Sequence, residues 1–258
     1  MQSALDSFET RKASILHKAF TGELTAKWRE EHGVKLEGWE KRKINSVAKT
    51  QAGYAFDSKL FSADGIQVVR MGNLFNGLLD LSRNPVFVNE NILDAVITEK
   101  FCIKRGSILL TLTGTKYKRD YGYAVLISED IPLLLNQRIL SLCPDKIATN
   151  YLLYYLRSDQ FRDIFFSNET GGVNQGNVSS KFVENIEMPF PSLHEQQEIV
   201  RILDSLLESE SKAKELCDTI DKIDLMKKSI LARAFRGELS TNNPGEESAV
   251  ELLRKILA

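Results

Sequence analysis

The sequence predicts an α+β protein in which one globular mixed α/β region is joined to a long α-helical coiled-coil arm. Three observations lead to this fold class. Apolar residues recur at steps of three and four over positions 199–234, short β-rich runs bounded by glycine or polar turns lie within 65–128, and nearly the same stretch stands near both ends. A helical period and a strand pattern in separate parts of one chain are typical of α+β proteins.

The repeated stretch is the first element along the chain. Between Ser14–Thr25 and Ser229–Ser240, eight of twelve positions are identical at a constant offset of 215 residues. The second copy lies at the end of the long periodic segment. The first copy therefore predicts a shorter helix of the same type over residues 3–20.

The middle of the chain has the texture of a compact α/β region. The runs "GIQVVRMGNLF" (65–75), "GSILLTLTG" (106–114) and "YGYAVLIS" (121–128) predict strands. The segment "NYLLYYLRSDQFRDIFF" (150–166) has helical spacing, whereas "NETGGVNQGNVSS" (168–180) is polar, glycine-rich and aperiodic, which predicts a loop.

A long helix is predicted from Leu193 to Phe235, about 64 Å at 1.5 Å per residue. Ser192, followed three residues later by Glu195, forms a capping-box pattern at its start, and Gly237 is a plausible stop signal. The apolar seam, broken only by a serine and a lysine, runs through positions 199, 202, 206, 209, 213, 216, 220, 223, 227, 230 and 234. Five heptads of this kind favour a coiled coil; a helix that lies on its own domain is the alternative.

These elements suggest four segments. Residues 1–34 form an N-terminal helical segment, residues 35–191 the globular domain and residues 192–239 the long coiled-coil helix. Residues 240–258 contain a polar linker, "STNNPGEES", followed by a short amphipathic helix, "AVELLRKILA".

The composition is typical of a soluble globular protein. No apolar run approaches the roughly 18 residues of a membrane span, and no basic stretch before an apolar one marks a signal peptide. The three cysteines are scattered, which indicates a reducing compartment, the cytoplasm, and no structural zinc. Because the net charge is −1, any binding to nucleic acid relies on local basic patches.

The sequence lacks the motifs that would indicate phosphate binding, dinucleotide binding or methyl transfer. "TGTKYK" (113–118) lacks the spacing of a phosphate-binding loop, and no G-x-G-x-x-G follows a strand. "NPVF" (84–87) is similar to an amino-methyltransferase motif but lacks its second proline. His17, His32 and His194 lie in or beside helical segments, and the carboxylates show no metal-ligand grouping. We expect no catalytic residue, cofactor or metal ion in this chain.

Binding chemistry is better represented. "GTKYKRDYGY" (114–123) interleaves cations with tyrosines, and such cations can neutralise DNA phosphates. "GGVNQGN" (171–177) offers amides that can pair with adenine in the major groove. For each stretch a solvated loop, a structural turn or an internal tie between loops is an open alternative. Two arginines and an amide near predicted strand ends are further candidates. Together the candidate DNA contacts are Arg70, Asn73, Lys116, Tyr117, Lys118, Arg119, Arg138, Asn174, Gln175 and Asn177.

Taken together, the motifs resemble those of the specificity subunit of type I restriction-modification systems. The helical part of the resemblance is carried by "FPSLHEQQEIVRILDSLL" (190–207), by "KKSILARAFRGEL" (227–239) and by its partial copy "SILHKAFTGEL" (14–24), followed by Trp28. The target recognition part is carried by "GIQVVRMGNLFNG" (65–77), "KRGSILLTLTGT" (104–115), "LNQRILSLCP" (135–144) and "GGVNQGNVSSKFVENIEMPFP" (171–191).

The resemblance implies a protein that reads DNA sequence without catalysing a reaction. Members of the family typically carry two recognition domains, and this chain carries one, so it resembles half a specificity subunit. The expected partners are double-stranded DNA, a modification subunit that binds S-adenosylmethionine and a restriction subunit. A second copy of the chain would complete a homodimer that reads a bipartite, gapped target.

The helices are the expected assembly surface. The residues chosen for it are Ile15, Phe20, Ile202, Leu206, Leu216, Ile220, Ile223, Ile230 and Phe235. Pairing with a different half-subunit is an alternative to the homodimer. Two other functions also stay open: a self-contained DNA-modifying enzyme, and a coiled-coil scaffold that reads no DNA.

Overall fold

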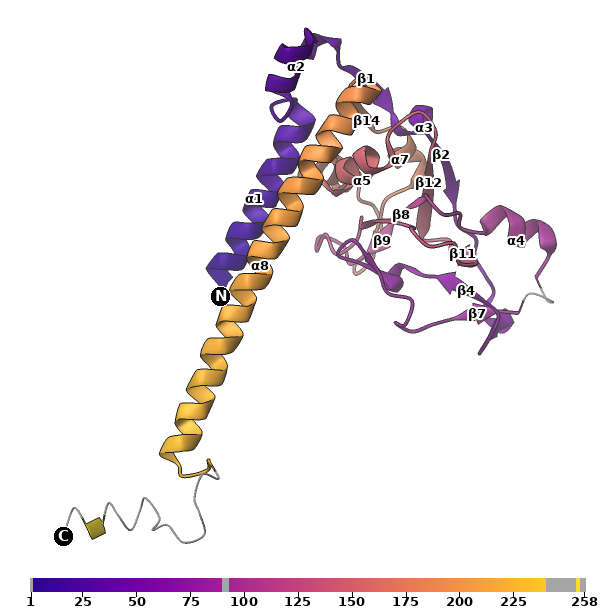
Figure 1. The fold of residues 1–258 in the computed structure, drawn as a ribbon. Coiled ribbons are helices and arrows are strands. Elements are labelled where there is room, and N and C mark those ends of the chain that lie inside the picture. Colours follow the sequence, from indigo (N-terminus) through magenta and orange to yellow (C-terminus); the bar gives the residue numbers. More distant parts are fainter. Residues whose placement is uncertain (1, 90–92, 240–253, 256–258) are drawn as a thin grey trace. The chain divides into compact units, whose positions relative to one another are not determined.

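The computed structural model describes residues 2–89, 93–239 and 254–255. The chain divides into two compact units: residues 11–206, which we call the main unit, and residues 1–10 together with 207–258. The predicted fold class, a mixed α/β region joined to a long helix, is confirmed (Figure 1). The four segments expected from the sequence have other boundaries than these two units, and they stay a prediction. The linker and most of the expected C-terminal helix lie outside the described residues.

The helices and strands alternate irregularly along the chain. The helical elements are α1 (Gln2–Thr21), α2 (Ala26–His32), η1 (Leu36–Gly38), α3 (Ile44–Val47), η2 (Ser58–Leu60), η3 (Met71–Asn73), α4 (Ala95–Phe101), α5 (Thr149–Arg157), α6 (Asp159–Ser167), α7 (Ser180–Glu184) and α8 (Leu193–Phe235). The strands are β1 (Glu40–Lys43), β2 (Ala48–Ala52), β3 (Phe61–Ser62), β4 (Ile66–Val69), β5 (Leu74–Phe75), β6 (Leu78–Leu79), β7 (Phe87–Val88), β8 (Ile108–Thr111), β9 (Thr113–Gly114), β10 (Ala124–Leu126), β11 (Leu133–Leu135), β12 (Ile139–Pro144), β13 (Gly176–Asn177) and β14 (Glu187–Phe190).

Two four-stranded sheets form the body of the main unit. One has the order β10-β8-β12-β2 and is antiparallel throughout. The other has the order β11-β4-β7-β3, in which only the β11–β4 pair is parallel. All four residues of β8 are buried, and the first three are apolar, as expected for a strand covered on both faces.

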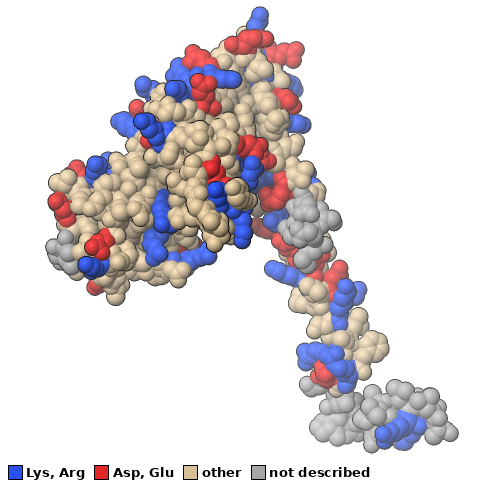
Figure 2. Space-filling view, turned by 180° about the vertical axis from the view of Figure 1, so that it is seen from behind, with Lys and Arg blue, Asp and Glu red and all other residues tan. Residues whose placement is uncertain are grey.

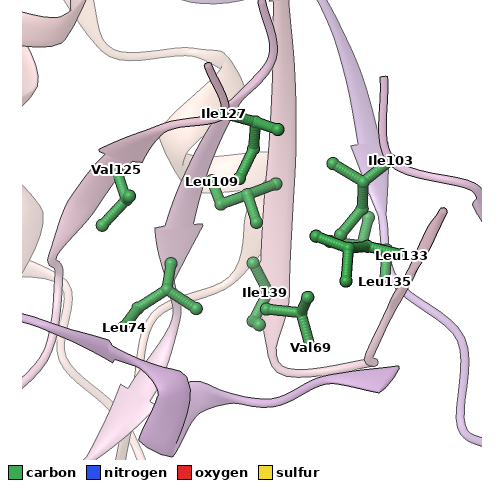
Figure 3. Packing of buried hydrophobic residues seen from close by; sticks show 9 residues of the cluster. All are labelled: Val69, Leu74, Ile103, Leu109, Val125, Ile127, Leu133, Leu135 and Ile139. Atoms are coloured by element: carbon green, nitrogen blue, oxygen red, sulfur yellow. The ribbon is translucent and has the colours of Figure 1, made fainter. Parts of the chain in front are cut away.

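An apolar cluster of nine buried residues joins the two sheets (Figure 3). Its members come from strands of both sheets and from the segments beside them, and each is at most 5% exposed. They are Val69, Leu74, Ile103, Leu109, Val125, Ile127, Leu133, Leu135 and Ile139. Because the loops that follow β4, β8 and β11 start from this packed core, their bases are held firmly.

The segment 150–166, for which helical spacing was predicted, forms two helices, α5 and α6. The break lies at Ser158, whose backbone is extended. Its hydroxyl oxygen accepts a hydrogen bond from the backbone N–H of Phe161 at 3.2 Å, which caps the second helix at its N-terminus. A serine within an apolar period is the signal that the sequence reading passed over.

The first copy of the repeat is helical, as predicted, and packs on α5. The ring of Phe20 lies 5.4 Å from that of Tyr151 and 5.3 Å from that of Tyr155, both edge to face. Phe20 is only 3% exposed. Its assignment to an assembly surface is therefore wrong in this structure, because the chain's own main unit covers it.

The long helix α8 is confirmed, but the covered face of its first turns follows the predicted seam only at Ile199. Ile199 and Leu203 are fully buried, whereas Ile202 is half-buried and Leu206 is 38% exposed. The start of α8 thus lies on its own unit, which was the alternative interpretation. The buried side chains at the start of α8, such as Ile199 and Leu203, are four residues apart, whereas the predicted seam alternates steps of three and four.

Glu195 is the centre of a buried polar cluster. Its Oε1 accepts hydrogen bonds from the Thr25 hydroxyl and from Arg29 Nη1, both at 2.7 Å, and its Oε2 accepts one from Trp39 Nε1 at 2.8 Å. Of the expected capping box only one half forms, the bond from the Glu195 N–H to Ser192 Oγ at 3.3 Å. The carboxylate instead ties the α1–β1 connection to the first turn of α8, and its charge is paired with Arg29.

The strands at the two ends of the globular region pair with each other. β1 and β14 are antiparallel, with Glu40 opposite Phe190 and Lys43 opposite Glu187. The Arg42 guanidinium lies 4.3 Å from the centre of the Phe190 ring, across this pair. In the described part of the chain, no helix is both long and apolar enough to cross a membrane.

Candidate nucleic-acid interface

Two polar stretches, 114–123 and 168–177, lie against each other. The first was chosen from the sequence as a binding stretch, and the second contains the chosen stretch 171–177. Their ends form the short antiparallel pair β9–β13, with Gly114 opposite Gly176. At the other side of the contact, Lys116 Nζ donates a hydrogen bond to the carbonyl oxygen of Gly171 at 3.1 Å. We call the two stretches together the paired loops. This is a tertiary contact between residues 55 positions apart, and the sequences of the two stretches do not predict it.

Glu169 holds the paired loops together. Its Oε1 accepts a hydrogen bond from the Tyr121 hydroxyl at 2.7 Å, and its Oε2 accepts one from the backbone N–H of Tyr117 at 3.1 Å. Burial of the Tyr121 ring, and then the bond to Glu169, raise the pKa of that hydroxyl well above its usual range. Tyr121 therefore stays protonated and keeps donating at neutral pH. Nothing in the sequence singled out Glu169.

Glycine is required where the two loops pass each other. A Cβ added to Gly176 would stand 2.3 Å from Glu169 Oε1, and one added to Gly114 would stand 2.6 Å from the Tyr121 ring. Both distances are too short for any side chain. The close approach that lets Glu169 reach across therefore depends on these two glycines.

Arg119 belongs to the paired loops but its charge is partly compensated. Its Nη1 lies 2.9 Å from Asp163 Oδ1, and its guanidinium lies 5.3 Å from the Phe166 ring centre. Its backbone carbonyl accepts a hydrogen bond from Arg162 Nη2 at 2.8 Å. Burial lowers the pKa of Arg162 from its ordinary value, although arginine keeps its charge at neutral pH.

The outer edge of the paired loops carries the exposed side chains. Tyr117 is 82% exposed and Val173 is 93% exposed, and Lys118, Asn174 and Gln175 are exposed beside them in the sequence. Tyr117 has a φ of +66°, a left-handed conformation that costs of order 1–3 kcal/mol for a non-glycine residue. The structure thus holds an aromatic ring outward at the expense of local strain. Sequence reasoning did not select Val173.

Asn73 does not belong to the exposed surface. It is 2% exposed, and its side-chain amide donates to the carbonyl oxygens of Asp80 at 2.9 Å and Arg83 at 2.8 Å. Its Oδ1 accepts the backbone N–H of Arg70 at 2.9 Å. The prediction that Asn73 reads a base is wrong, because both of its amide hydrogens hold the chain internally. Arg70 is exposed.

A hairpin that the sequence reading missed stands next to the paired loops. β5 and β6 are joined by Asn76 and Gly77, both with positive φ, the Asn-Gly turn typical of tight hairpins. The Phe75 ring lies 5.6 Å from that of Tyr123 in the paired loops. Leu78, across the turn, is 71% exposed. The dipeptide was visible in the sequence and would have predicted this turn.

Two further candidates, one beside the paired loops and one at their edge, take part in backbone hydrogen bonds. The carbonyl oxygen of Arg138 accepts the N–H of Leu112, which directly precedes β9, at 2.9 Å. Asn177 is half-buried and exchanges backbone hydrogen bonds with Thr170 at 2.9 and 2.8 Å. Arg138 is exposed. Whether either side chain contacts DNA stays a prediction.

The helical candidates fall into two groups. Ile15 and Ile202 are half-buried within the main unit. The candidates beyond residue 206 are all at least half exposed, and they are Leu216 (62%), Ile220 (50%), Ile223 (52%), Ile230 (54%) and Phe235 (90%). The sequence prediction of an uncovered apolar row on α8 agrees with these exposures.

The described residues contain no group of three or more histidine, cysteine, aspartate or glutamate side chains placed to hold a metal ion. Charge is also dispersed: on the face drawn in Figure 2, basic and acidic side chains are interspersed. The paired loops present exposed polar and aromatic side chains on a backbone braced by Glu169.

Comparison with known proteins identifies similar chains. The type I restriction modification DNA specificity domain matches residues 36–222. The EcoBI specificity subunit of Escherichia coli is 26% identical over 96% of this chain and 55% of that protein. The MjaVIII specificity subunit of Methanocaldococcus jannaschii is 26% identical over 90% of this chain and 52% of that protein. This chain thus spans about half the length of these curated relatives.

A solved structure has a similar fold. The HsdS subunit from Thermoanaerobacter tengcongensis superposes with a TM-score of 0.58 at 18% identity, covering 92% of this chain and 53% of that one. At this identity the likeness concerns the fold, in which a globular domain is followed by a long helix.

Proposed function

This chain belongs to the family of type I restriction modification DNA specificity domains, and from that premise we propose that it selects the DNA sequence on which a multisubunit enzyme acts. The paired loops are the reading surface in this proposal. The observation that carries it is the joining of two distant polar loops, braced by Glu169, into one exposed surface.

The chemistry of the paired loops suits double-stranded DNA. Lys118 is an exposed cation that can neutralise a phosphate, and Asn174 and Gln175 can each form two hydrogen bonds with an adenine edge. Tyr117 presents a flat apolar ring that can stack or fill a groove. Because Glu169 fixes both loops on a packed core, the contacts are organised before DNA arrives, which lowers the cost of ordering them.

The proposed assembly places catalysis elsewhere. A modification subunit binds S-adenosylmethionine and catalyses methyl transfer, and a restriction subunit cleaves DNA. This chain selects the DNA sequence, and the complex acts in the cytoplasm. Two copies pair through the exposed apolar row of α8 and hold two identical reading surfaces apart, so that the target is an inverted repeat with a gap. A row of large apolar side chains that stays exposed in one chain supports this pairing.

The test measures DNA binding by the complex reconstituted with its modification subunit. Lys118→Ala should reduce the slope of log affinity against log salt by about 1, because one phosphate contact is lost. Asn174→Ala or Gln175→Ala should cost about 1–3 kcal/mol at one base position and relax the preference there. Selection from a pool of random duplexes reads out that preference.

Lys212 supplies the matched control. It is an exposed lysine on α8 that pairs with Glu208 at 2.7 Å, outside the paired loops. Lys212→Ala should leave both affinity and sequence preference unchanged. If the three loop variants behave like this control, the paired loops do not read DNA and a scaffold role becomes the better account.

A further inference from the structure

Both copies of the sequence repeat end their helices in the same way. Gly22 follows α1 with a φ of +84°, and Gly237, its equivalent 215 residues later, follows α8 with a φ of +68°. Their surroundings differ. A Cβ on Gly22 would stand 2.4 Å from Leu36 Cδ1, whereas a Cβ on Gly237 would meet nothing within 4 Å. The two copies of the repeat therefore share a local structure, a helix that ends at a left-handed glycine. Only the glycine of the first copy has other residues packed against it.

The first copy fills a defined seat on the main unit. Leu16, Ala19 and Phe20 are at most 3% exposed. The Phe20 ring packs edge to face on Tyr151 and Tyr155 of α5. We call the site around these two tyrosines the α5 seat.

The second copy carries the same side chains without a seat. Leu231 is 49% exposed, Phe235 is 90% exposed and Ala234 is exposed. These three residues are identical to the three that the first copy buries. An exposed phenylalanine at the end of a helix, within a segment that already fits a seat in the same protein, indicates a docking element.

The differences between the copies support this reading. His17, Lys18 and Thr21 are replaced in the second copy by alanine and two arginines, and all three are exposed or half-buried in the first copy. The fourth difference replaces Thr25 by serine, which keeps the hydroxyl that Thr25 donates to Glu195. Three of the four substitutions thus fall at positions that the α5 seat leaves exposed or half-buried, and the fourth preserves a hydroxyl of the kind that Thr25 donates to Glu195.

We infer that the end of α8 docks in the α5 seat of a second copy of this chain, where it takes the place of that chain's α1. One seat accepts one copy of the repeat, so the contact is an exchange of equivalent segments between chains. This inference rests on the self-association proposed above and specifies which surfaces meet. It does not depend on the reading of DNA.

The exchange is close to balanced in its contacts, because the buried side chains are the same in both copies. What favours the docked form is the additional apolar surface of α8, including Leu216, Ile220 and Ile223, that association covers. Protein concentration then decides which copy fills the seat.

Cross-linking between chains tests the contact directly. Gln160 is exposed and lines a cavity of about 590 Å³ together with Phe20 and Thr21. Arg236 is the equivalent of Thr21, so docking brings it to this cavity. One chain with Arg236→Cys and another with Gln160→Cys, both with exposed Cys217 changed to serine, should form a mixed disulfide.

Met226 provides the control for the cross-link. It is 57% exposed on α8, but its equivalent lies ten residues before Thr21, about 15 Å along a helix. Met226→Cys should give at least tenfold less cross-link with Gln160→Cys than Arg236→Cys does. Equal yields from the two positions would overturn the inference.

A second measurement needs no cysteine. Phe235→Ala should weaken self-association at least tenfold in sedimentation equilibrium, and Met226→Ala, which removes an apolar side chain of α8 that is 57% exposed, should not. Both chains should fold, since both positions are exposed. A dimer that survives Phe235→Ala overturns the seat exchange while leaving self-association intact. A wild-type chain that stays monomeric at tens of micromolar overturns both, and DNA reading by the paired loops is then judged separately by the Lys118, Asn174 and Gln175 variants.

Discussion

Two copies of one sequence occupy opposite environments in this protein. Phe20 is 3% exposed and Phe235 is 90% exposed, although the residues around them are nearly the same. Both copies form a helix and both stop at a left-handed glycine. The local sequence thus determines the helix and its end, while neighbouring elements determine which side chains are buried.

The largest expected effect separates the two phenylalanines. Phe20→Ala removes a ring packed between Tyr151 and Tyr155 and should lower the free energy of unfolding by about 3–5 kcal/mol. Phe235→Ala should change it by no more than about 0.5 kcal/mol in dilute solution, because the ring is exposed. Urea denaturation of both variants measures the difference. Equal losses would mean that the second copy is also buried by its own chain.

The next comparison concerns two glutamates. Glu195→Gln leaves Arg29 buried without its charge partner and should cost about 3 kcal/mol. Glu238, near the end of the second copy, pairs with Arg236 in an exposed ion pair at 2.6 Å, so Glu238→Gln should cost less than about 1 kcal/mol. Thermal unfolding at matched protein concentration compares them. A cost below 1 kcal/mol for Glu195→Gln would contradict the role given to the buried cluster.

A smaller contrast is expected at the two glycines. Alanine at either Gly22 or Gly237 must adopt a left-handed backbone, a cost of about 1 kcal/mol. Gly22→Ala also drives a methyl group against Leu36 and should cost about 1 kcal/mol more. Chemical denaturation should therefore rank Gly22→Ala below Gly237→Ala in stability. The reverse order would show that the first copy is the less constrained of the two.

The smallest effect is expected from making the copies alike. The triple change His17→Ala, Lys18→Arg and Thr21→Arg gives the first copy the second copy's residues at positions that are exposed or half-buried. It should alter the unfolding free energy by about 0.5 kcal/mol or less. Differential scanning calorimetry suffices for this measurement, and a loss above 2 kcal/mol would show that the two copies are not interchangeable in the α5 seat.

The sequence predicted the elements better than their contacts. The strands around Val68 and Leu109, the helix α8 and the helical repeat followed from period and glycine placement. The covered face of α8 was predicted only in part, because Ile199 was in the predicted seam whereas Leu203, which the main unit also buries, was not. The break at Ser158 was missed since a single serine can equally sit on an exposed helix face.

The candidate site was predicted in part. Both stretches of the paired loops are polar loops, as predicted, but no feature of the sequence indicated that they meet or that Glu169 joins them. Asn73 was misplaced because an amide that ties a hairpin and an amide that reads a base have the same sequence signature. Partners distant along the chain decide such roles, and a single sequence does not record them.

The pairing of β1 with β14 has a consequence for how such a protein changes. Lys43 and Glu187 lie opposite each other, about one strand spacing apart, so the intervening chain leaves and returns at nearly one point. A segment with neighbouring ends can be exchanged as a cassette while the helices on either side keep their positions. Two genetic recombination events, one in the coding sequence of each of these adjacent strands, would then place a globular segment with a different sequence preference between the same helices.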